Sequence, residues 1–488
     1  MKALENIQEI RNFFKKNTTP IYFFGVSCFH LMGIERWVSK FKFITYIDSF
    51  DGQCEHVFSP KNKEVLINLH DIEEVNNYLL SHPEVIDYIN NNGGSGNSNG
   101  KVLFLMFNKY TEILAKKLNL EILYPSFELI SFLDNNLYTN MIAEKAEVPF
   151  KPQILTKVNS YKHLLPLTSS LGTDLAIQTP FGYAGHNTFL VSNKEDYNKY
   201  AAEIEREKIV KITRRESSYI NTAIEACVTN QGTLTAPLMI DLTGFEELTP
   251  HKSGWCGNEI YPHSFNHQIR EKAKNYTVKF GNLLWKEGYR GYFELDFLVD
   301  SEDNEIYFNE LNPRISGLSN LTNNSKFTNI DVPLFLFHLL EWMDIPFNID
   351  INSLNNNWLT DDYVGEWTQV IIKHTLDTKE LITDVPVSGI WKMKIDGSIA
   401  FISDATNQNE IKDENQAYFL NIIQPENYMY RGLNLGVLFV KNSFINDQHQ
   451  LTKHAKRWIN AIRSLYRSDV IDYNDKTFEV EEKRLKKI

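Results

Sequence analysis

Short apolar runs alternate with helix-like patterns over residues 1–130. The runs cover residues 20–26, 41–47 and 102–107. Between the first two, Leu31, Ile34 and Val38 recur at the spacing of a helix face, and residues 110–118 show a second helical pattern. Buried strands that alternate with helices are typical of a parallel sheet with helices on its faces. The first part of the chain is therefore predicted to form a parallel α/β layer.

The pattern changes after Asp134. Residues 140–146 have a helical pattern, which Val148-Pro149 ends, and two short strand-like runs follow at residues 175–178 and 188–191. The turn between these two runs contains Gly182, Gly185 and His186. Main-chain N–H groups of such a turn can point at phosphate oxygens. An ordinary hairpin also needs glycine in its turn, so the turn taken alone leaves both interpretations open.

The C-terminal part mixes strand-like and helical patterns. Residues 389–395 form a strand-like run before the turn Asp396-Gly397. One helical face near the end is formed by Leu451, Ala455, Trp458, Ile459, Ile462 and Leu465, which predicts a helix docked on the core. Residues 90–100 are rich in asparagine and glycine but lack a following Lys-Ser/Thr pair. We therefore interpret them as a surface loop and not as a phosphate-binding loop.

Length and composition limit the class of protein. A chain of 488 residues is too long to fold around a single hydrophobic core. Its contents of 42% apolar and 23% charged residues are ordinary for a globular protein. The net charge of −12 argues against general binding to nucleic acid or to an anionic membrane. The four cysteines show no metal-binding spacing. With no apolar run of membrane-spanning length and a charged amphipathic start, we expect a cytoplasmic protein.

The densest polar pattern lies between Gly288 and Gly317. Two alternating runs, residues 288–300 and 305–317, are joined by a polar turn and predict a β-hairpin. In the first run, Phe293, Leu295 and Phe297 share one face, and Glu294 and Asp296 share the other. In the second run, the shared face is predicted to hold Phe308, Glu310 and Asn312. Such a hairpin sets Asp296 beside Glu310 and Asn312.

These side chains suit a magnesium site. Two carboxylates and an amide oxygen on rigid strands are the hard ligands that Mg²⁺ accepts, with water or phosphate oxygens in its other positions. Without a cation, Asp296 and Glu310 would repel each other. Arg314, two residues after Asn312, offers a planar fork of donors to a phosphoryl or carboxylate group. The hairpin is therefore predicted to bind a metal ion and an anionic substrate.

The same segment resembles the closing motif of the ATP-grasp carboxylate–amine ligases and of biotin carboxylase. The resemblance rests on Gly288-Tyr-Arg-Gly and on Glu310-Leu-Asn-Pro-Arg314, and extends over about residues 130–320. It implies metal ligands at Asp296 (in place of Glu294), Glu310 and Asn312, and a catalytic arginine at Arg314. It also implies bound ATP with Mg²⁺ or Mn²⁺.

The resemblance also implies an architecture. We expect an N-terminal parallel α/β domain over residues 1–130, which precedes the ATP-grasp domain. The ATP-grasp domain itself, of α+β type, is expected over residues 131–345 and includes a mobile lid around residues 150–210. A C-terminal α+β domain is expected over residues 346–488. The overall fold class is α/β. A homodimer would fit the family.

This sequence lacks two lysines that bind phosphate in the family. Gln178 stands where the family places a lysine before the glycine turn, and Asn136 stands near a second such position. Losing both cations removes stabilisation of the triphosphate. Lys211, His186 and Lys252 are possible replacements. We predict nucleotide contacts from Gln178, Gly182, Gly185, His186 and Lys211.

Lys252 belongs to the segment 249–259, which is dense in polar and aromatic residues. This segment either lines the acceptor site, where Lys252 would act in catalysis, or is a loop that packs Trp255 into the core. We carry Lys252 and Arg314 as the candidate catalytic residues.

The leading hypothesis is an ATP-dependent carboxylate–amine ligase. Its small-molecule carboxylate would form an acylphosphate and ADP, and an amine, as in an amino acid or peptide, would displace phosphate to give an amide. A bicarbonate-using enzyme like biotin carboxylase is an alternative, but Asn312-Pro-Arg-Ile-Ser-Gly317 lacks that family's Gln-Val-Glu-His continuation. A non-catalytic nucleotide-binding module is a third hypothesis, motivated by Gln178 and Asn136.

Overall fold

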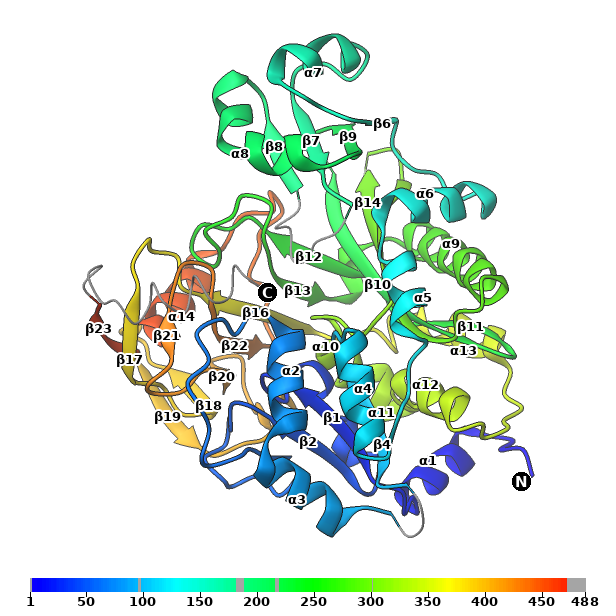
Figure 1. Ribbon diagram of the computed structural model, residues 1–488, viewed down its shortest axis with the longest axis vertical. Helices are drawn as coiled ribbons and strands as arrows, with labels where there is room; N and C mark the ends of the chain where they lie inside the picture. Colours follow the sequence, from blue (N-terminus) through cyan, green and yellow to red (C-terminus); the bar gives the residue numbers. More distant parts are fainter. Residues whose placement is uncertain (1, 95–97, 181–187, 216–218, 301, 472–488) are drawn as a thin grey trace.

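The computed structural model describes residues 2–94, 98–180, 188–215, 219–300 and 302–471 (Figure 1). Gly182, Gly185 and His186, for which nucleotide contacts were predicted, lie outside the described residues. Within the described ranges, no helix is both long enough and apolar enough to cross a membrane.

The N-terminal sheet is parallel throughout, which confirms the predicted α/β layer. Its strand order is β3-β2-β1-β4-β5. The strands are β1 (Ile21–Gly25), β2 (Phe41–Thr45), β3 (Val57–Phe58), β4 (Gly100–Phe104) and β5 (Leu120–Ile122). The α-helices of this part are α1 (Ile7–Lys15), α2 (Ile72–Ser81), α3 (Pro83–Asn92), α4 (Lys109–Lys117) and α5 (Phe127–Leu133). Every residue of β1 is buried, as expected for a central strand covered on both faces.

The prediction of a single helix through Leu31, Ile34 and Val38 is wrong. Two short 3₁₀ turns stand there, η1 (Phe29–Leu31) and η2 (Ile34–Arg36). Gly33 separates them with a left-handed φ of 102°, a conformation that ends helical geometry. The apolar residues are nevertheless buried as the periodicity predicted, because the 3₁₀ turns point them into the core.

A smaller antiparallel sheet forms a separate unit at the top of Figure 1. Its strand order is β6-β9-β7-β8. It contains β6 (Gln153–Thr156), β7 (Leu175–Gln178), β8 (Thr188–Val191), β9 (Val210–Arg214), α7 (Tyr161–Leu167) and α8 (Lys194–Arg206). Its buried residues form their own hydrophobic cluster, separate from the main core. The unit coincides with the predicted lid, whose motion remains a prediction.

An eleven-stranded sheet forms the centre of the molecule. Its order is β15-β14-β10-β12-β13-β16-β22-β20-β18-β19, with β11 paired to β10. The strands before the predicted boundary at residue 345 are β10 (Ile220–Thr229), β11 (Gly232–Thr235), β12 (Met239–Thr243), β13 (Trp255–Ile260), β14 (Gly291–Asp300) and β15 (Glu305–Asn312). Those after it are β16 (Trp367–Lys373), β18 (Gly389–Met393), β19 (Ile399–Ser403), β20 (Gln416–Asn421) and β22 (Asn434–Val440). The sheet thus crosses that boundary through β13 and β16.

The remaining elements pack around this sheet. A three-stranded sheet in the order β21-β17-β23 is formed by β21 (Tyr428–Met429), β17 (Glu380–Asp384) and β23 (Arg467–Val470). The helices are α6 (Asn136–Lys145), α9 (His267–Lys286), α10 (Ser319–Asn323), α11 (Lys326–Ile330), α12 (Phe335–Trp342), α13 (Ile351–Trp358) and α14 (Lys453–Arg463). The predicted docked helix near the C-terminus is confirmed as α14, because Ala455, Trp458, Ile459 and Ile462 are all buried.

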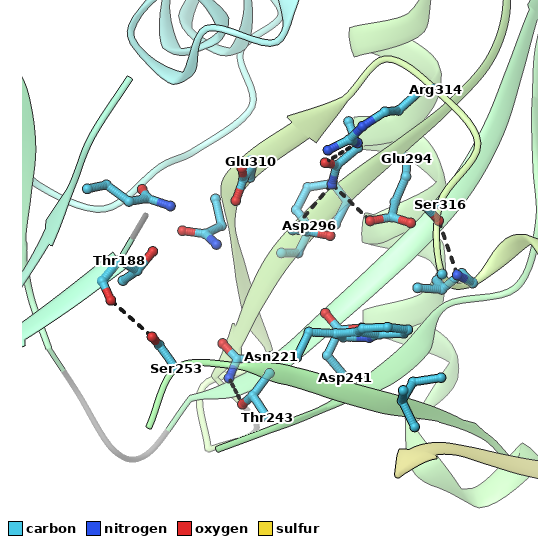
Figure 2. A pocket seen from close by; sticks show the side chains of 18 of the residues that line it. Thr188, Asn221, Asp241, Thr243, Ser253, Glu294, Asp296, Glu310, Arg314 and Ser316 are labelled. Atoms are coloured by element: carbon cyan, nitrogen blue, oxygen red, sulfur yellow. Dashed lines mark hydrogen bonds between the residues drawn. The ribbon is translucent and has the colours of Figure 1, made fainter. Parts of the chain in front are cut away.

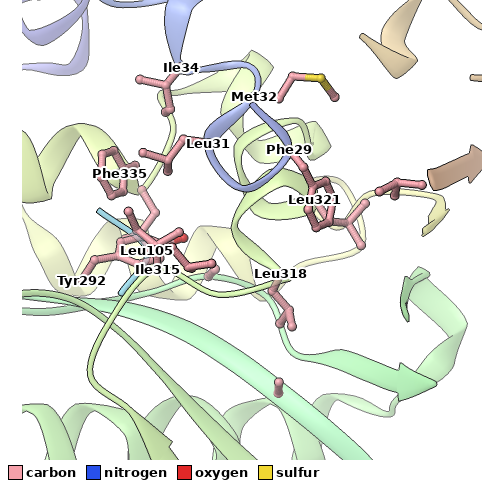
Figure 3. Packing of buried hydrophobic residues seen from close by; sticks show 14 of the residues in the cluster. Phe29, Leu31, Met32, Ile34, Leu105, Tyr292, Ile315, Leu318, Leu321 and Phe335 are labelled. Atoms are coloured by element: carbon pink, nitrogen blue, oxygen red, sulfur yellow. The ribbon is translucent and has the colours of Figure 1, made fainter. Parts of the chain in front are cut away.

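The main core joins the N-terminal layer to the end of the β14–β15 hairpin. Figure 3 shows Phe29 beside Leu321 and Ile315 beside Leu105, and η1 lies next to α10. All of these side chains are buried in one hydrophobic cluster. The turn after β1 therefore packs against the segment that follows Arg314. Burying this much apolar surface fixes the strand end at which the polar residues of the hairpin meet.

Gly257 is needed where β13 meets β16. Its φ is 147°, and a Cβ atom there would lie 2.1 Å from the main-chain oxygen of Gln369. We expect Gly257→Ala to destabilise the protein by more than about 3 kcal/mol, because strain and overpacking of the backbone add. The midpoint of thermal unfolding measures this loss. Gly365→Ala, where the nearest atom would be 3.4 Å away, is the control, and equal midpoints for the two variants would contradict the prediction.

Candidate active site

The predicted hairpin is confirmed, with one correction. Asp296 lies opposite Glu310, and Glu294 lies opposite Asn312, across β14 and β15. The register shifts after Asp296, so that Phe297 pairs with Phe308. Phe308 therefore shares the apolar face of Phe297 and stacks on Phe280 of α9. Placing Phe308 on the face of Glu310 was wrong, because a bulge adds one residue to β15 and reverses the alternation.

The polar face of the hairpin opens into a cavity of about 620 Å³. Elements from all parts of the chain line it, including the turn after β1, the smaller antiparallel sheet and β16. The predicted site residues that line it are Gln178, Lys211, Lys252, Asp296, Glu310, Asn312 and Arg314. Figure 2 shows Glu294, Asp296, Glu310 and Arg314 close together on one side of this space. The volume is in the range of ligand sites for small molecules and cofactors.

Arg314 is held at the end of β15 by polar neighbours. Its Nη1 donates to Asn312 Oδ1 at 2.6 Å, and its Nη2 lies 3.9 Å from Asp134 Oδ1. Only 9% of Arg314 is exposed. Burial would lower the pKa of Arg314, but the surrounding carboxylates, Asp134 first among them, raise it. The guanidinium therefore stays charged and faces the cavity.

Lys211 stands directly across from Gln178. The two residues are partners in the β7–β9 pair, so their side chains lie on the same face of the smaller antiparallel sheet. Lys211 is only 4% exposed, and its Nζ donates to the main-chain oxygen of Asn309 at 2.9 Å. Asn136, at the start of α6, donates from Nδ2 to Glu310 Oε1 at 3.3 Å. Both positions where the family resemblance predicted lysines thus lie next to the hairpin.

Known proteins resemble this chain in structure. No protein-family model and no curated relative matches the sequence. Carboxyaminoimidazole ribonucleotide synthase from Aspergillus clavatus, solved with ATP, has a TM-score of 0.53 and 13% identity over 92% of this chain and 99% of its own. The biotin carboxylase domain of Hydrogenobacter thermophilus 2-oxoglutarate carboxylase has a TM-score of 0.58 and 10% identity, covering 93% and 92%. Campylobacter jejuni biotin carboxylase has a TM-score of 0.56 and 12% identity, covering 93% of both chains.

The chain has the ATP-grasp fold. The predicted fold class, and the likeness in fold predicted from residues 288–317, are thereby confirmed. At identities of 10–13%, the likeness establishes the fold alone, and the activity must be argued from the site.

The carboxylates that line this cavity repel one another. Burial, followed by Glu294, Asp241 and Glu310, raises the pKa of Asp296 well above its usual range. Burial also raises the pKa of Glu310, against the opposing effect of Lys211. A buried carboxylate keeps its charge only when a cation compensates it. The site is therefore built to accept positive charge.

Mg²⁺ fits this site as an ion shared between protein carboxylates and the phosphate oxygens of a ligand. Within the residues described, no three His, Cys, Asp or Glu side chains converge on one metal position. Asp296 and Glu310 offer two hard oxygen ligands, and Mg²⁺ commonly takes one or two carboxylates together with phosphate oxygens. Asn312 points its NH₂ group at Glu294 and Asp296 and its oxygen at Arg314. Its predicted ligation requires the amide to turn over.

Part of the segment 249–259 lines the cavity, and its role in an acceptor site stays a prediction. Lys252, Ser253 and Trp255 all face it. Ser253 Oγ donates to the main-chain oxygen of Thr188 at 3.0 Å, which joins this segment to β8. Trp255 is only partly buried, and its ring lies against Gly317. The packing of Trp255 and the lining of the site are therefore compatible.

Three further residues of the cavity were not assigned from the sequence. Glu294 was set aside in favour of Asp296, although the strand alternation put both on one face. Asp241 and Lys373 stand in β12 and β16 without any motif around them. The pairing of β13 with β12 and with β16 brings these two strands to the site. A sequence offers no signal for such juxtapositions.

Lys373 is a buried cation whose titration can be measured. It is 3% exposed, donates to the main-chain oxygen of Trp255 at 2.6 Å, and burial lowers its pKa from 10.5 to about 8. The unfolded chain therefore binds the proton between pH 8 and 10.5 while the native protein has released it, so stability rises with pH in that window. Relative to Lys373→Met, the free energy of unfolding of the wild type is expected to increase by roughly 3 kcal/mol across this window. Denaturant-induced unfolding at several pH values measures the free energy of unfolding of both proteins. A difference between wild type and Lys373→Met that does not change with pH would contradict the prediction.

Proposed function

We propose that this protein is an ATP-dependent ligase that joins a carboxylate to an amine. The carboxylate attacks the γ-phosphoryl group to give an acylphosphate and ADP, and the amine then displaces phosphate to give an amide. The observation that carries this proposal is the pair Asp296 and Glu310 facing each other across a buried hairpin, with Arg314 at its end. A phosphoryl-transfer site needs this concentration of fixed charge.

Each residue has a defined task in this proposal. Asp296 and Glu310 would hold Mg²⁺, which supplies positive charge to the phosphoryl oxygens. Arg314 points its guanidinium into the cavity and stabilises the negative charge on the acylphosphate. Lys211 supplies the cation that Gln178 lacks and approaches the phosphates from β9. Most of the catalytic effect comes from positioning and electrostatics.

The far wall of the cavity supports a carboxylate as the acyl donor. Lys373 provides a positive charge there, and Ile371, Ile422 and Leu433 provide apolar surface beside it. An anionic head with an apolar body matches such a wall. An amino acid or a peptide is proposed as the amine.

A cytoplasmic location and a homodimer are also part of this proposal.

The names of the similar structures agree with nucleotide chemistry. One was solved with ATP, and another with MgADP and bicarbonate. These ligands belong to those proteins. For this chain they support testing bicarbonate as an alternative carboxylate.

Mg-ATP turnover against a panel of carboxylates and amines tests the proposal. Release of ADP and phosphate that requires both a carboxylate and an amine is the expected result. AMP release would contradict the acylphosphate route, and dependence on bicarbonate without an amine would favour a carboxylase. Nucleotide binding that is independent of Mg²⁺, without turnover, would favour a non-catalytic module.

A further inference from the structure

The N-terminal sheet turns the carboxyl ends of two strands toward the cavity. β1 and β4 pair in parallel, with Phe24 opposite Phe104, and the chain continues from them to β2 and β5 on opposite sides of the sheet. In open parallel sheets, ligands bind outside the carboxyl ends of two strands that diverge in this way. Here the residues after both strands line the cavity, namely Val26, Ser27, Phe29 and His30 after β1, and Leu105 and Met106 after β4. We call these six residues the β1–β4 wall.

Apolar side chains dominate the β1–β4 wall. Four of its six residues are apolar, and Leu69 and Ile72 extend that surface from the start of α2. The wall contains no Asp, Glu, Lys or Arg, whereas the opposite side of the cavity holds Lys373. A carboxylate on this wall would find no compensating cation within it. The wall therefore suits an uncharged, apolar group.

Hydrogen bonds from neighbouring elements fix the wall in place. The main-chain oxygen of Val26 accepts from the main-chain N–H of Ile47 at 2.8 Å. The main-chain oxygen of Met106 accepts from Asn76 Nδ2, also at 2.8 Å. Asn76 is fully buried in α2. The wall is thus formed before a ligand arrives, which lowers the entropy cost of binding.

The wall lies beside the strand end that carries Arg314. Figure 3 shows Phe29 of the wall beside Leu321, and Leu105 of the wall beside Ile315. Ile315 is the residue directly after Arg314. A molecule on the β1–β4 wall is therefore close to the group that would stabilise the acylphosphate.

His30 is the titratable residue of the wall. Its side chain is partly buried and makes no hydrogen bond or ion pair with the residues that the structure describes. Burial, followed by the charge of Arg314, lowers the pKa of His30 to about 3, so the imidazole is neutral at physiological pH. A neutral imidazole has one N–H donor and one bare nitrogen that accepts a hydrogen bond. Both are available to a molecule in the cavity.

We propose that the β1–β4 wall binds the acceptor amine, that this amine carries an apolar side group, and that His30 accepts a hydrogen bond from its nitrogen. The inference rests on the proposed function and narrows its acceptor to an amino acid amide or peptide whose first side chain is apolar. Such α-amino groups have pKa values of about 7.7–8.0, so a large share is uncharged near pH 8. Only the uncharged amine can attack an acylphosphate, and a neutral wall next to Arg314 favours that form.

Acceptor selectivity is the first test. With an acyl donor and Mg-ATP, leucinamide is expected to give a kcat/KM about 10- to 100-fold above that of glycinamide, because its side chain is buried on the wall. Valinamide should likewise exceed threoninamide, which has the same shape but carries a hydroxyl group. Equal kcat/KM values within both pairs would overturn the proposal.

Substitutions on the wall give the second test. In a folded Val26→Phe protein, which fills the space beside the wall, kcat/KM for leucinamide should fall about 10-fold further than the rate of trapping by hydroxylamine, a much smaller nucleophile. Val65→Phe, at a valine that is exposed, is the matched control. His30→Leu should raise the KM for leucinamide by about 10-fold, and His30→Gln, which keeps an acceptor, should restore most of the affinity. Equal losses for both nucleophiles, or equal KM values in the two His30 variants, would contradict the assignment.

Binding can also be measured without turnover. In the full chain labelled with ¹³C at histidine Cε1, the NMR signal of His30 is identified by its absence from His30→Gln. Leucinamide, added with Mg²⁺ and a non-hydrolysable ATP analogue, is expected to shift this signal more than glycinamide does at the same concentration. No shift with leucinamide overturns the proposal. A shift in a protein that shows no carboxylate-dependent ADP release would leave the amine site standing and remove the ligase, whereas ligase turnover without a shift would do the reverse.

Discussion

Glu310→Gln is expected to lower the rate of ADP formation by about 10³-fold or more while making the protein more stable. Glutamine keeps the shape of the side chain but removes one of the two carboxylates that face each other across the hairpin. Burial raises the pKa of Glu310 more than Lys211 lowers it, and Asp134 adds to the rise, so the ionised group is unfavourable here. Turnover and thermal unfolding should therefore change in opposite directions, as is common where stability is traded for function.

The matched control is Glu305→Gln. Glu305 begins the same strand and pairs with Lys272 at 2.7 Å, far along β15 from the cavity. Its loss should leave turnover near the wild-type value. Normal ADP formation by the Glu310 variant would remove Glu310 from the metal site. A fall in both turnover and stability would show that Glu310 serves the fold.

Lys211→Met is expected to reduce kcat/KM for ATP by about 10²-fold or more. The loss of one preorganised positive charge beside a phosphate costs several kcal/mol of transition-state stabilisation. Burial lowers the pKa of Lys211 to about 8, against the pull of Glu310 and Asp296, so a nucleotide phosphate would further favour its charged form. ATP affinity and steady-state kinetics measure the effect, with exposed Lys208→Met as the control.

A second substitution distinguishes a phosphate contact from a structural role. Because Gln178 is the cross-strand partner of Lys211, a lysine at Gln178 would project from the same face one strand away. The double variant Lys211→Met/Gln178→Lys should recover about 10-fold of the lost activity if charge is what the site needs. A structural role for the Lys211–Asn309 hydrogen bond predicts no recovery, and unchanged kinetics in Lys211→Met alone would exclude Lys211 from the nucleotide site.

The sequence was sufficient for the hairpin because strand alternation is a local property. Asp296 and Glu310 were placed opposite each other from residue spacing alone, and the structure pairs them. The bulge that turns Phe308 over was missed because an unbroken alternation was assumed along β15, although its buried apolar residues are 306, 308 and 311. Gly33 likewise replaced a predicted helix by two 3₁₀ turns while the buried positions stayed the same.

The rest of the site depends on long-range pairing. Lys211 was one of several candidate cations until the register of β7 and β9 set it across from Gln178. Asp241, Asn258 and Lys373 come together through strands whose order in the sheet no local pattern encodes. Sequence analysis could therefore name the paired carboxylates of the hairpin, while the positions of Asp241 and Lys373 in the cavity required the fold.

The hydrogen bonds between β13 and β16 have a practical consequence for dissecting this protein. A fragment ending at residue 345 would keep β13 but lose its partner, leaving a row of unpaired backbone groups on residues 257–260. Exposed sheet edges of this kind recruit other chains. Such a fragment is expected to aggregate even though its own motif is intact. The part of the chain before residue 345 should be expressed together with the strands that complete its sheet.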